Sequence, residues 1–314
     1  VWERALSLDV GALARGDSVA YEGDGEHTHF PHRFFEEASD PTRSNELNRW
    51  AYGQIYPDQA VAEFAWEAVQ ELGIGQNGVT DLLALSFSQT DAIGHDYGPF
   101  SVEQLENLLH LDGLLGDLME RLDDAVGPGN WVMALTGDHG TLAVPEYLVE
   151  EGLEGGRPTR QDLSTLRNLF RASGDRNGEP LDVANELVAA LEALPFIADA
   201  FPVAEMISGP PADSFSVLFR NSYHPDRWHW GYGSQGSGVL FRFSESLYPD
   251  PEPRGSGHGS PYYYDRHVPL ILYGSGVPNG VSDDPVRTVD IAPTLAALAG
   301  IPIPEDLDGV ALFE

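Results

Sequence analysis

Three short strings in the sequence combine carboxylates and imidazoles with glycine. Asp91 and His95 lie four residues apart in S-Q-T-D-A-I-G-H, directly after an apolar run. Asp138 and His139 are neighbours in L-T-G-D-H-G, and His258 lies in G-S-G-H-G-S-P. Zinc accepts imidazole nitrogen and carboxylate oxygen, and glycine gives a loop the freedom that lets neighbouring side chains converge. We therefore predict that these five side chains meet in a site for two divalent metal ions.

Any one of these strings alone would be read as structural, because Asp and His are common in turns. The conjunction of three favours a site. The string E-H-T-H-F-P-H at Glu26–His32 has no flanking strand, so we interpret it as an ordinary polar loop. His110 and His267 are expected to be structural, and no role is assigned to His224 and His229 in their aromatic-rich loop.

Two apolar runs predict the strands that position the first two strings. Thr80–Ser88 and Trp131–Thr136 are nearly continuous apolar segments, as is typical of strands buried on both faces of a parallel sheet. Between them Ser101 begins a helix, with Gln104 three residues on and leucines at helical intervals to about Val126. This strand–helix–strand pattern places both strings at the carboxyl ends of strands, where ligands bind in open α/β sheets.

The rest of the chain shows weaker patterns. Residues 1–41 are expected to be irregular, and about 145–235 to form an inserted helical and irregular subregion. Further helices are predicted over Arg43–Leu72, Arg160–Ala172, Leu181–Leu194 and Asp290–Ala299, the last ended by Gly300. Further strands are predicted over Phe215–Phe219, Gly238–Phe243 and His267–Tyr273.

Composition excludes several classes of function. The chain of 314 residues carries a net charge of −33, and its 17 basic residues are all arginine. Such a surface repels a phosphate backbone, so we do not expect a nucleic-acid partner. The absence of cysteine excludes disulfides and cysteine-ligated metal sites, and no apolar run is long enough to span a membrane. The first residues include neither an initiator methionine nor an export signal, so we expect the chain to begin within a longer protein.

Longer stretches around the three strings resemble the alkaline phosphatase superfamily. These are S-Q-T-D-A-I-G-H-D-Y-G-P, A-L-T-G-D-H-G and G-S-G-H-G-S-P-Y-Y-Y-D-R-H-V-P-L-I-L-Y-G, followed by R-T-V-D-I-A-P-T-L-A-A-L-A-G-I-P-I-P. The resemblance is greatest to the type I phosphodiesterase/nucleotide pyrophosphatase branch, and within it to the periplasmic, phosphate-irrepressible alkaline phosphatases. It implies an α/β fold with a mostly parallel central sheet and helices on both faces. Residues 1–314 would form the C-terminal part of one catalytic domain, truncated at its N-terminus.

The resemblance also implies roles for the five residues. Asp91, His95 and His258 match the ligands of one zinc ion, and Asp138 and His139 match ligands of the other, with calcium or another divalent metal as an alternative. The implied activity is hydrolysis of small-molecule phosphate monoesters in the periplasm or outside the cell. It proceeds through a covalent phospho-enzyme on a Thr or Ser that would lie upstream of Val1, so we expect the chain alone to be inactive.

Other functions remain open on the sequence. A phosphodiesterase or nucleotide pyrophosphatase would use the same metal site, because the residues that separate monoesters from diesters in the family lie mostly upstream. Enzymes that act on sulfate esters and on phosphonates share the fold, although sulfatases typically use one metal ion and other ligands. A non-catalytic metal-binding or partner-binding domain is the alternative of another class.

Overall fold

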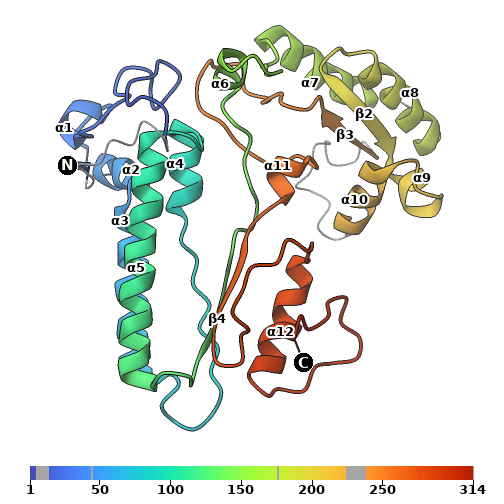
Figure 1. The fold of residues 1–314 in the computed structure, drawn as a ribbon. Helices are drawn as coiled ribbons and strands as arrows, with labels where there is room; N and C mark the ends of the chain where they lie inside the picture. The colour runs from blue at the N-terminus through green and yellow to red at the C-terminus, as the bar shows by residue number, and fades with distance from the viewer. Residues whose placement is uncertain (5–13, 44, 175–176, 224–237, 314) are drawn as a thin grey trace.

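The computed structural model describes residues 1–4, 14–43, 45–174, 177–223 and 238–313 (Figure 1). His224, His229 and their aromatic-rich loop lie outside this part of the chain. The helices are α1 (Phe34–Glu37), α2 (Glu46–Tyr52), α3 (Tyr56–Leu72), α4 (Gln89–Tyr97), α5 (Val102–Val126), α6 (Pro145–Glu150), α7 (Arg160–Gly174), α8 (Pro180–Glu192), α9 (Val203–Ser208), α10 (Ser214–Ser222), α11 (Tyr263–Arg266) and α12 (Ile291–Leu298), with a 3-10 turn at Thr288–Asp290. The strands are β1 (Val132–Thr136), β2 (Ile197–Pro202), β3 (Val239–Phe243) and β4 (Leu270–Gly274).

Helices α1 to α5 gather on one side of the molecule, and α6 to α10 with β2 and β3 gather on the other (Figure 1). The β1–β4 pair runs between the two groups, toward α12. Within the described residues no helix is both long and apolar enough to serve as a membrane span.

The ends of the long helices confirm the local signals in the sequence. The Ser101 hydroxyl accepts a hydrogen bond from the backbone N–H of Gln104 at 3.1 Å, which is the predicted cap of α5. The Gln104 side chain does not return to the cap but donates to the carbonyl of Thr90 at 3.0 Å, which fastens α5 to α4. Gly73, with φ +64°, ends α3 after Leu72, the last residue of the helix predicted from sequence. The single helix expected over 43–72 is divided into α2 and α3 after Gly53.

The leucine spacing of α5 predicted the helix but not the face that is buried. Leu108 is 46% exposed, whereas Glu103 and Asn107 are buried against α4 and the N-terminal segment. His32 contacts Oε1 of Glu103 at 3.1 Å, and Asn107 donates to the Thr90 hydroxyl at 3.2 Å, so the start of α5 packs through polar contacts.

The strand predicted over Thr80–Ser88 is wrong. The segment has no strand partner among the described residues, and Leu82 is 83% exposed. A strand exists only where a second backbone supplies hydrogen bonds, and the expected parallel partner, β1, pairs with β4 instead. That pairing is antiparallel, with Val132 opposite Gly274 and Thr136 opposite Leu270. The segments Trp131–Thr136 and His267–Tyr273 are thereby confirmed to contain strands. The predicted parallel pairing of Trp131–Thr136 with Thr80–Ser88 is not found.

The α6–α10 region contains both a confirmed and a wrong strand. Gly238–Phe243 forms β3, paired antiparallel with β2, a strand that the sequence interpretation missed. Phe215–Phe219 instead lies in α10, which begins with a capping box between Asp213 and Ser216. Helices α7 and α8 and strands β2 and β3 share one apolar core, which includes Leu187, Leu191, Phe241 and Phe243.

Candidate metal centre

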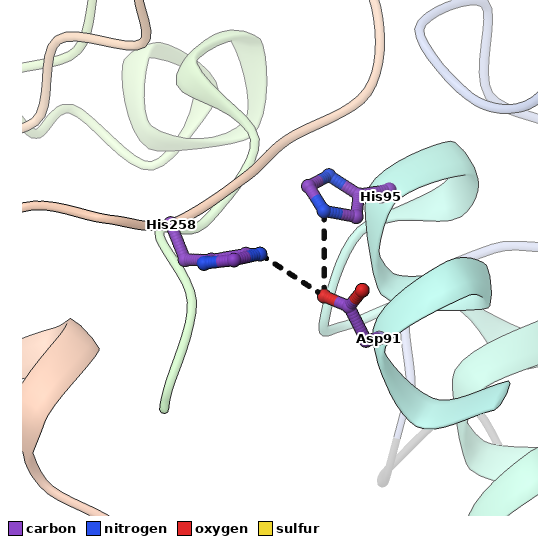
Figure 2. Close-up of side chains that lie close together, drawn as sticks. All are labelled: Asp91, His95 and His258. Atoms are coloured by element: carbon purple, nitrogen blue, oxygen red, sulfur yellow. Dashed lines mark ion pairs between the residues drawn. The ribbon is translucent and has the colours of Figure 1, made fainter. Parts of the chain in front are cut away.

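Helix α4 carries the first two candidate ligands. Asp91 and His95 were expected in a loop, but they lie on α4, where a spacing of four residues puts both side chains on one face. The Nε2 atom of His95 lies 3.3 Å from Oδ1 of Asp91. The helix therefore presents a carboxylate and an imidazole to the same point in space (Figure 2).

The third candidate, His258, reaches this point from a loop distant in sequence. Its Nε2 lies 3.3 Å from the same Oδ1 atom of Asp91 (Figure 2). The loop closes tightly on the end of α4: a Cβ on Gly255 would lie 2.6 Å from the carbonyl oxygen of His95. Gly255 also has φ +65°, so this approach requires glycine. The backbone N–H of Ser256 donates to the same carbonyl at 3.0 Å.

Asp138 and His139 enter from the loop after β1. The Nε2 atom of His139 lies 4.0 Å from Oδ1 of Asp91 and 3.7 Å from Oδ2 of Asp138, whose side chain is 90% exposed. The backbone N–H of Gly140 holds the loop by donating to the carbonyl of Asp265 at 2.7 Å. A Cβ at this position would lie 2.0 Å from the carbonyl oxygen of Tyr264, so only glycine fits. The structure thus brings His95, His139 and His258 to the Asp91 carboxylate, whereas Asp138 contacts this group only through His139.

The tautomers of two of these histidines suit metal binding. Nδ1 of His95 lies 2.7 Å from the carbonyl oxygen of Ser256, and Nδ1 of His139 lies 3.0 Å from that of Gly140. Because a carbonyl only accepts hydrogen bonds, Nδ1 carries the proton in each ring and Nε2 is free to act as a ligand. Burial, and next the charge of His139, lower the pKa of His258, which favours the neutral form that metals bind.

The donor set fits a divalent transition metal. Within the described residues, Asp91, His95 and His258 form a group of three whose ligand atoms all lie within 4.8 Å of one another. Two imidazoles with one carboxylate are a ligand set that zinc accepts while keeping a position open. His139 stands beside this group, 4.0 Å from Asp91, and Asp138 lies 3.7 Å from His139.

The sequence interpretation missed the residues that hold the His258 loop. Arg157 donates to both carboxylate oxygens of Glu146 at 2.8 Å and to the carbonyl of Gly255 at 2.7 Å. Its guanidinium lies 5.2 Å from the ring centroid of Tyr248, and this ring fills the space where Gly257 lacks a side chain. Nothing in the spacing of these residues identifies them, because their partners come from distant segments.

The string Glu26–His32 does not form a second centre among the described residues. His27 pairs with Asp24 at 2.8 Å on the surface. His32 is fully buried, with Nε2 at 3.1 Å from Glu103 and Nδ1 at 3.2 Å from Glu37. Its two nitrogens face opposite carboxylates, so the ring joins two segments and does not share one ion with its neighbours.

A cavity of about 550 Å³ adjoins the metal centre, because Asp91 and His95 form part of its wall. The sequence interpretation did not foresee it. Its remaining lining residues are Gly23, Asp24, His27, Glu37, Arg49, Trp50, Tyr52, Gly53, Gln54, Ala92, Asp96, Tyr97 and Arg254.

Comparison with known proteins shows the family to which the chain belongs. Residues 21–250 match the family model described as type I phosphodiesterase / nucleotide pyrophosphatase. The chain is 28% identical to alkaline phosphatase PhoV of Synechococcus elongatus over 329 aligned residues, covering 100% of this chain and 58% of that protein. It is 27% identical to alkaline phosphatase PhoK of a Sphingomonas species, covering 82% of this chain and 51% of that protein.

The solved structure of wild-type alkaline phosphatase PafA superposes with a TM-score of 0.83 at 22% identity, covering 99% of this chain and 62% of that one. This likeness confirms the alkaline-phosphatase-like α/β fold, and the chain spans about three fifths of the length of PhoV and PafA. The family match confirms the relationship to the alkaline phosphatase superfamily, and with it to the phosphate-irrepressible alkaline phosphatases. The chain belongs to the type I phosphodiesterase / nucleotide pyrophosphatase family.

Proposed function

We propose that this protein hydrolyses small-molecule phosphate monoesters with the help of two divalent metal ions. The observation that carries the proposal is the convergence of the imidazoles of His95, His139 and His258 on the Asp91 carboxylate, at 3.3, 4.0 and 3.3 Å. Two bound cations would polarise the phosphoryl oxygens and reverse the repulsion between an anionic ester and a protein of charge −33.

Within this proposal Asp91, His95 and His258 hold one ion, and Asp138 and His139 supply ligands to the other. Zinc is the favoured metal because three of the five ligands are imidazoles, whereas calcium prefers oxygen ligands throughout. Calcium or another divalent ion remains an alternative for the second site, where Asp138 is a more exposed donor.

The hydroxyls around the centre are better suited to structure than to nucleophilic attack. Thr141 donates to the carbonyl of Gly257 at 3.1 Å, and Ser256 donates to the carbonyl of Leu142. The Thr90 hydroxyl accepts a hydrogen bond from Asn107 at 3.2 Å. We therefore include in the proposal that the Thr or Ser of a covalent phospho-enzyme comes from residues outside this chain, and that the working protein is periplasmic or secreted like the enzymes it resembles.

The test has two parts. The chain itself is titrated with zinc, and we expect stoichiometric binding that His258→Ala abolishes. For activity, the chain is joined to the part of PhoV that the match does not cover, and p-nitrophenyl phosphate hydrolysis is measured with and without a chelator. Zinc-dependent hydrolysis that His258→Ala removes and His267→Ala retains would support the proposal, because His267 is exposed and stacks on Tyr263.

The match to a phosphodiesterase family model favours one second candidate, hydrolysis of phosphodiesters or nucleotide pyrophosphates. Bis-p-nitrophenyl phosphate separates the two: cleavage of the diester alone would replace the proposed monoesterase. Zinc binding without turnover of either ester in the joined protein would instead identify a non-catalytic metal-binding domain.

A further inference from the structure

The cavity beside the metal centre has a wall that the proposed chemistry does not use. Asp91 and His95 line it together with other residues of α4, and the rest of the wall comes from the loop before α1, from α1 and α2 with the residues that follow α2, and from the segment before His258. Any group bound there is a direct neighbour of a phosphate held at the centre. A volume of about 550 Å³ lies within the range of small-molecule sites and exceeds what a phosphate alone requires.

The cations in the wall already have counter-charges. His27 pairs with Asp24 at 2.8 Å, and Arg49, whose side chain is largely exposed, pairs with Glu46 at 2.9 Å. Arg254 donates to the carbonyl of Asp24 and acts electrostatically on the Asp96 carboxylate. With its charges balanced in this way, the wall is poorly equipped to bind a second anionic group on the substrate.

The cavity wall also contains two aromatic side chains, Trp50 and Tyr52, that a ligand could contact. The Trp50 indole donates to Oε2 of Glu37 at 2.9 Å, and its ring contacts Phe34 edge-on and Tyr56 at a tilt, with centroids 5.9 and 6.2 Å away. These three contacts hold the ring in place, while part of it remains exposed to the cavity. Tyr52 lines the same cavity and is 60% exposed. A ring that is already ordered loses little conformational entropy when a ligand packs on it.

We propose that this cavity binds the leaving group of the ester, and that it selects an uncharged planar ring through Trp50 and Tyr52. The inference rests on the proposed function in one respect, since the metal centre must hold the phosphorus end of the same molecule. The charge balance disfavours a second phosphate or carboxylate, and the two aromatic side chains favour a flat apolar face.

The experiment uses phosphonates, which the enzyme cannot cleave as esters. Phenylphosphonate, methylphosphonate and inorganic phosphate are titrated into the zinc-loaded chain by calorimetry. We expect phenylphosphonate to bind about 5- to 10-fold more tightly than methylphosphonate, as an aromatic contact contributes. Trp50→Ala should remove this preference and Trp50→Phe should retain most of it. Trp66→Ala is the matched control, because Trp66 is also half-buried but lies on α3 against Arg121.

A second measurement needs neither metal nor turnover. Phenol is titrated into the chain while the indole N–H resonance of Trp50 is followed, the resonance being identified by its loss in Trp50→Phe. We expect that resonance to shift and that of Trp66 to stay. If neither phosphonate binds but phenol shifts the Trp50 resonance, the proposed function fails, whereas the proposed binding site for an aromatic ring is supported. Equal affinity for both phosphonates, or equal loss of preference in Trp50→Ala and Trp66→Ala, would overturn the inference. Unchanged phosphate affinity shows that Trp50→Ala is folded.

Discussion

The imidazole rings of His139 and His258 stack face to face, with centroids 3.4 Å apart and an interplanar angle of 13°. Two positive rings would repel at this distance, so the stack disfavours the state in which both imidazoles are charged. The lowered pKa of His258, which arises first from burial and then from the charge of His139, acts in the same direction. His258 thus meets Asp91 in the form that binds a metal, and the two rings come from segments at the same end of the β1–β4 pair, since one follows Thr136 and the other precedes its partner Leu270.

Removing one of these rings should weaken metal binding strongly. For His258→Ala we expect zinc affinity to fall by more than about 100-fold, beyond the tenfold to hundredfold typical of residues that only support a ligand. Competition with a chromophoric chelator measures the affinity. His267→Ala should leave it unchanged, and equal losses in both variants would mean that the effect is not one of ligation.

Arg157 should act on the metal through the loop that carries His258. Arg157→Ala removes the paired hydrogen bonds to Glu146 and the bond to the Gly255 carbonyl. We expect zinc affinity to fall about tenfold and the free energy of unfolding to fall by about 2 kcal/mol. Arg157→Lys should restore little of either, because an ammonium cannot reproduce the two-pronged contact. Denaturant unfolding and zinc titration provide the two readouts, and full affinity in Arg157→Ala would contradict this role.

The candidate ligands could be predicted from sequence because their signal is local. A carboxylate or imidazole near glycine marks a segment that can present a side chain, and the structure brings His95, His139 and His258 to Asp91, while Asp138 lies beside His139 with an exposed side chain. Helix ends were also predictable, since the Ser101 cap and the glycine at 73 act within one turn. The tertiary contacts that bring loops from distant parts of the sequence together could not be predicted.

The wrong and missed predictions concern strands, which form only when another strand lies beside them. Whether Thr80–Ser88 forms a strand is decided by a neighbouring backbone, which an apolar pattern does not specify. The same is true of β2, whose partner β3 lies beyond α9 and α10 in the chain. The segment 215–219 did carry a local signal, the capping box of Asp213 and Ser216, which outweighs its apolar appearance.

The stability of the protein should depend on pH through His32. Burial alone would lower the pKa of His32, but the hydrogen bonds that its ring donates to Glu103 and then to Glu37 outweigh burial and raise the pKa to about 9. Tyr97 also faces the ring, with its hydroxyl 3.3 Å from Nδ1. Because this pKa lies above the unfolded value of 6.5, the protonated ring stabilises the fold fully below pH 6.5. The stabilisation is lost as pH rises through about 9.

His32→Gln isolates this contribution. We compare the free energy of unfolding of the wild type with that of the variant at each pH. We expect this difference to be about 2 to 3 kcal/mol larger at pH 6 than at pH 10. Buried Glu22, whose pKa burial raises to about 8, adds a pH dependence of the same sign, but it is present in both proteins and cancels in the difference. Urea unfolding at several pH values provides the measurement, and a difference that does not change with pH would show that His32 does not titrate in this range.

Removing the metal should also lower stability, because an ion that binds only the folded chain stabilises it by mass action. At a free zinc concentration one hundred times the dissociation constant the gain is about 2.7 kcal/mol. Asp91→Asn should abolish the gain, since its Oδ1 is the atom that the histidine nitrogens share. Asp283→Asn makes the same chemical change at an exposed position and should retain it. Thermal unfolding with zinc and with chelator measures the effect. Zinc stabilisation that survives in Asp91→Asn would place the ion elsewhere, and the five side chains would then have to be explained without it.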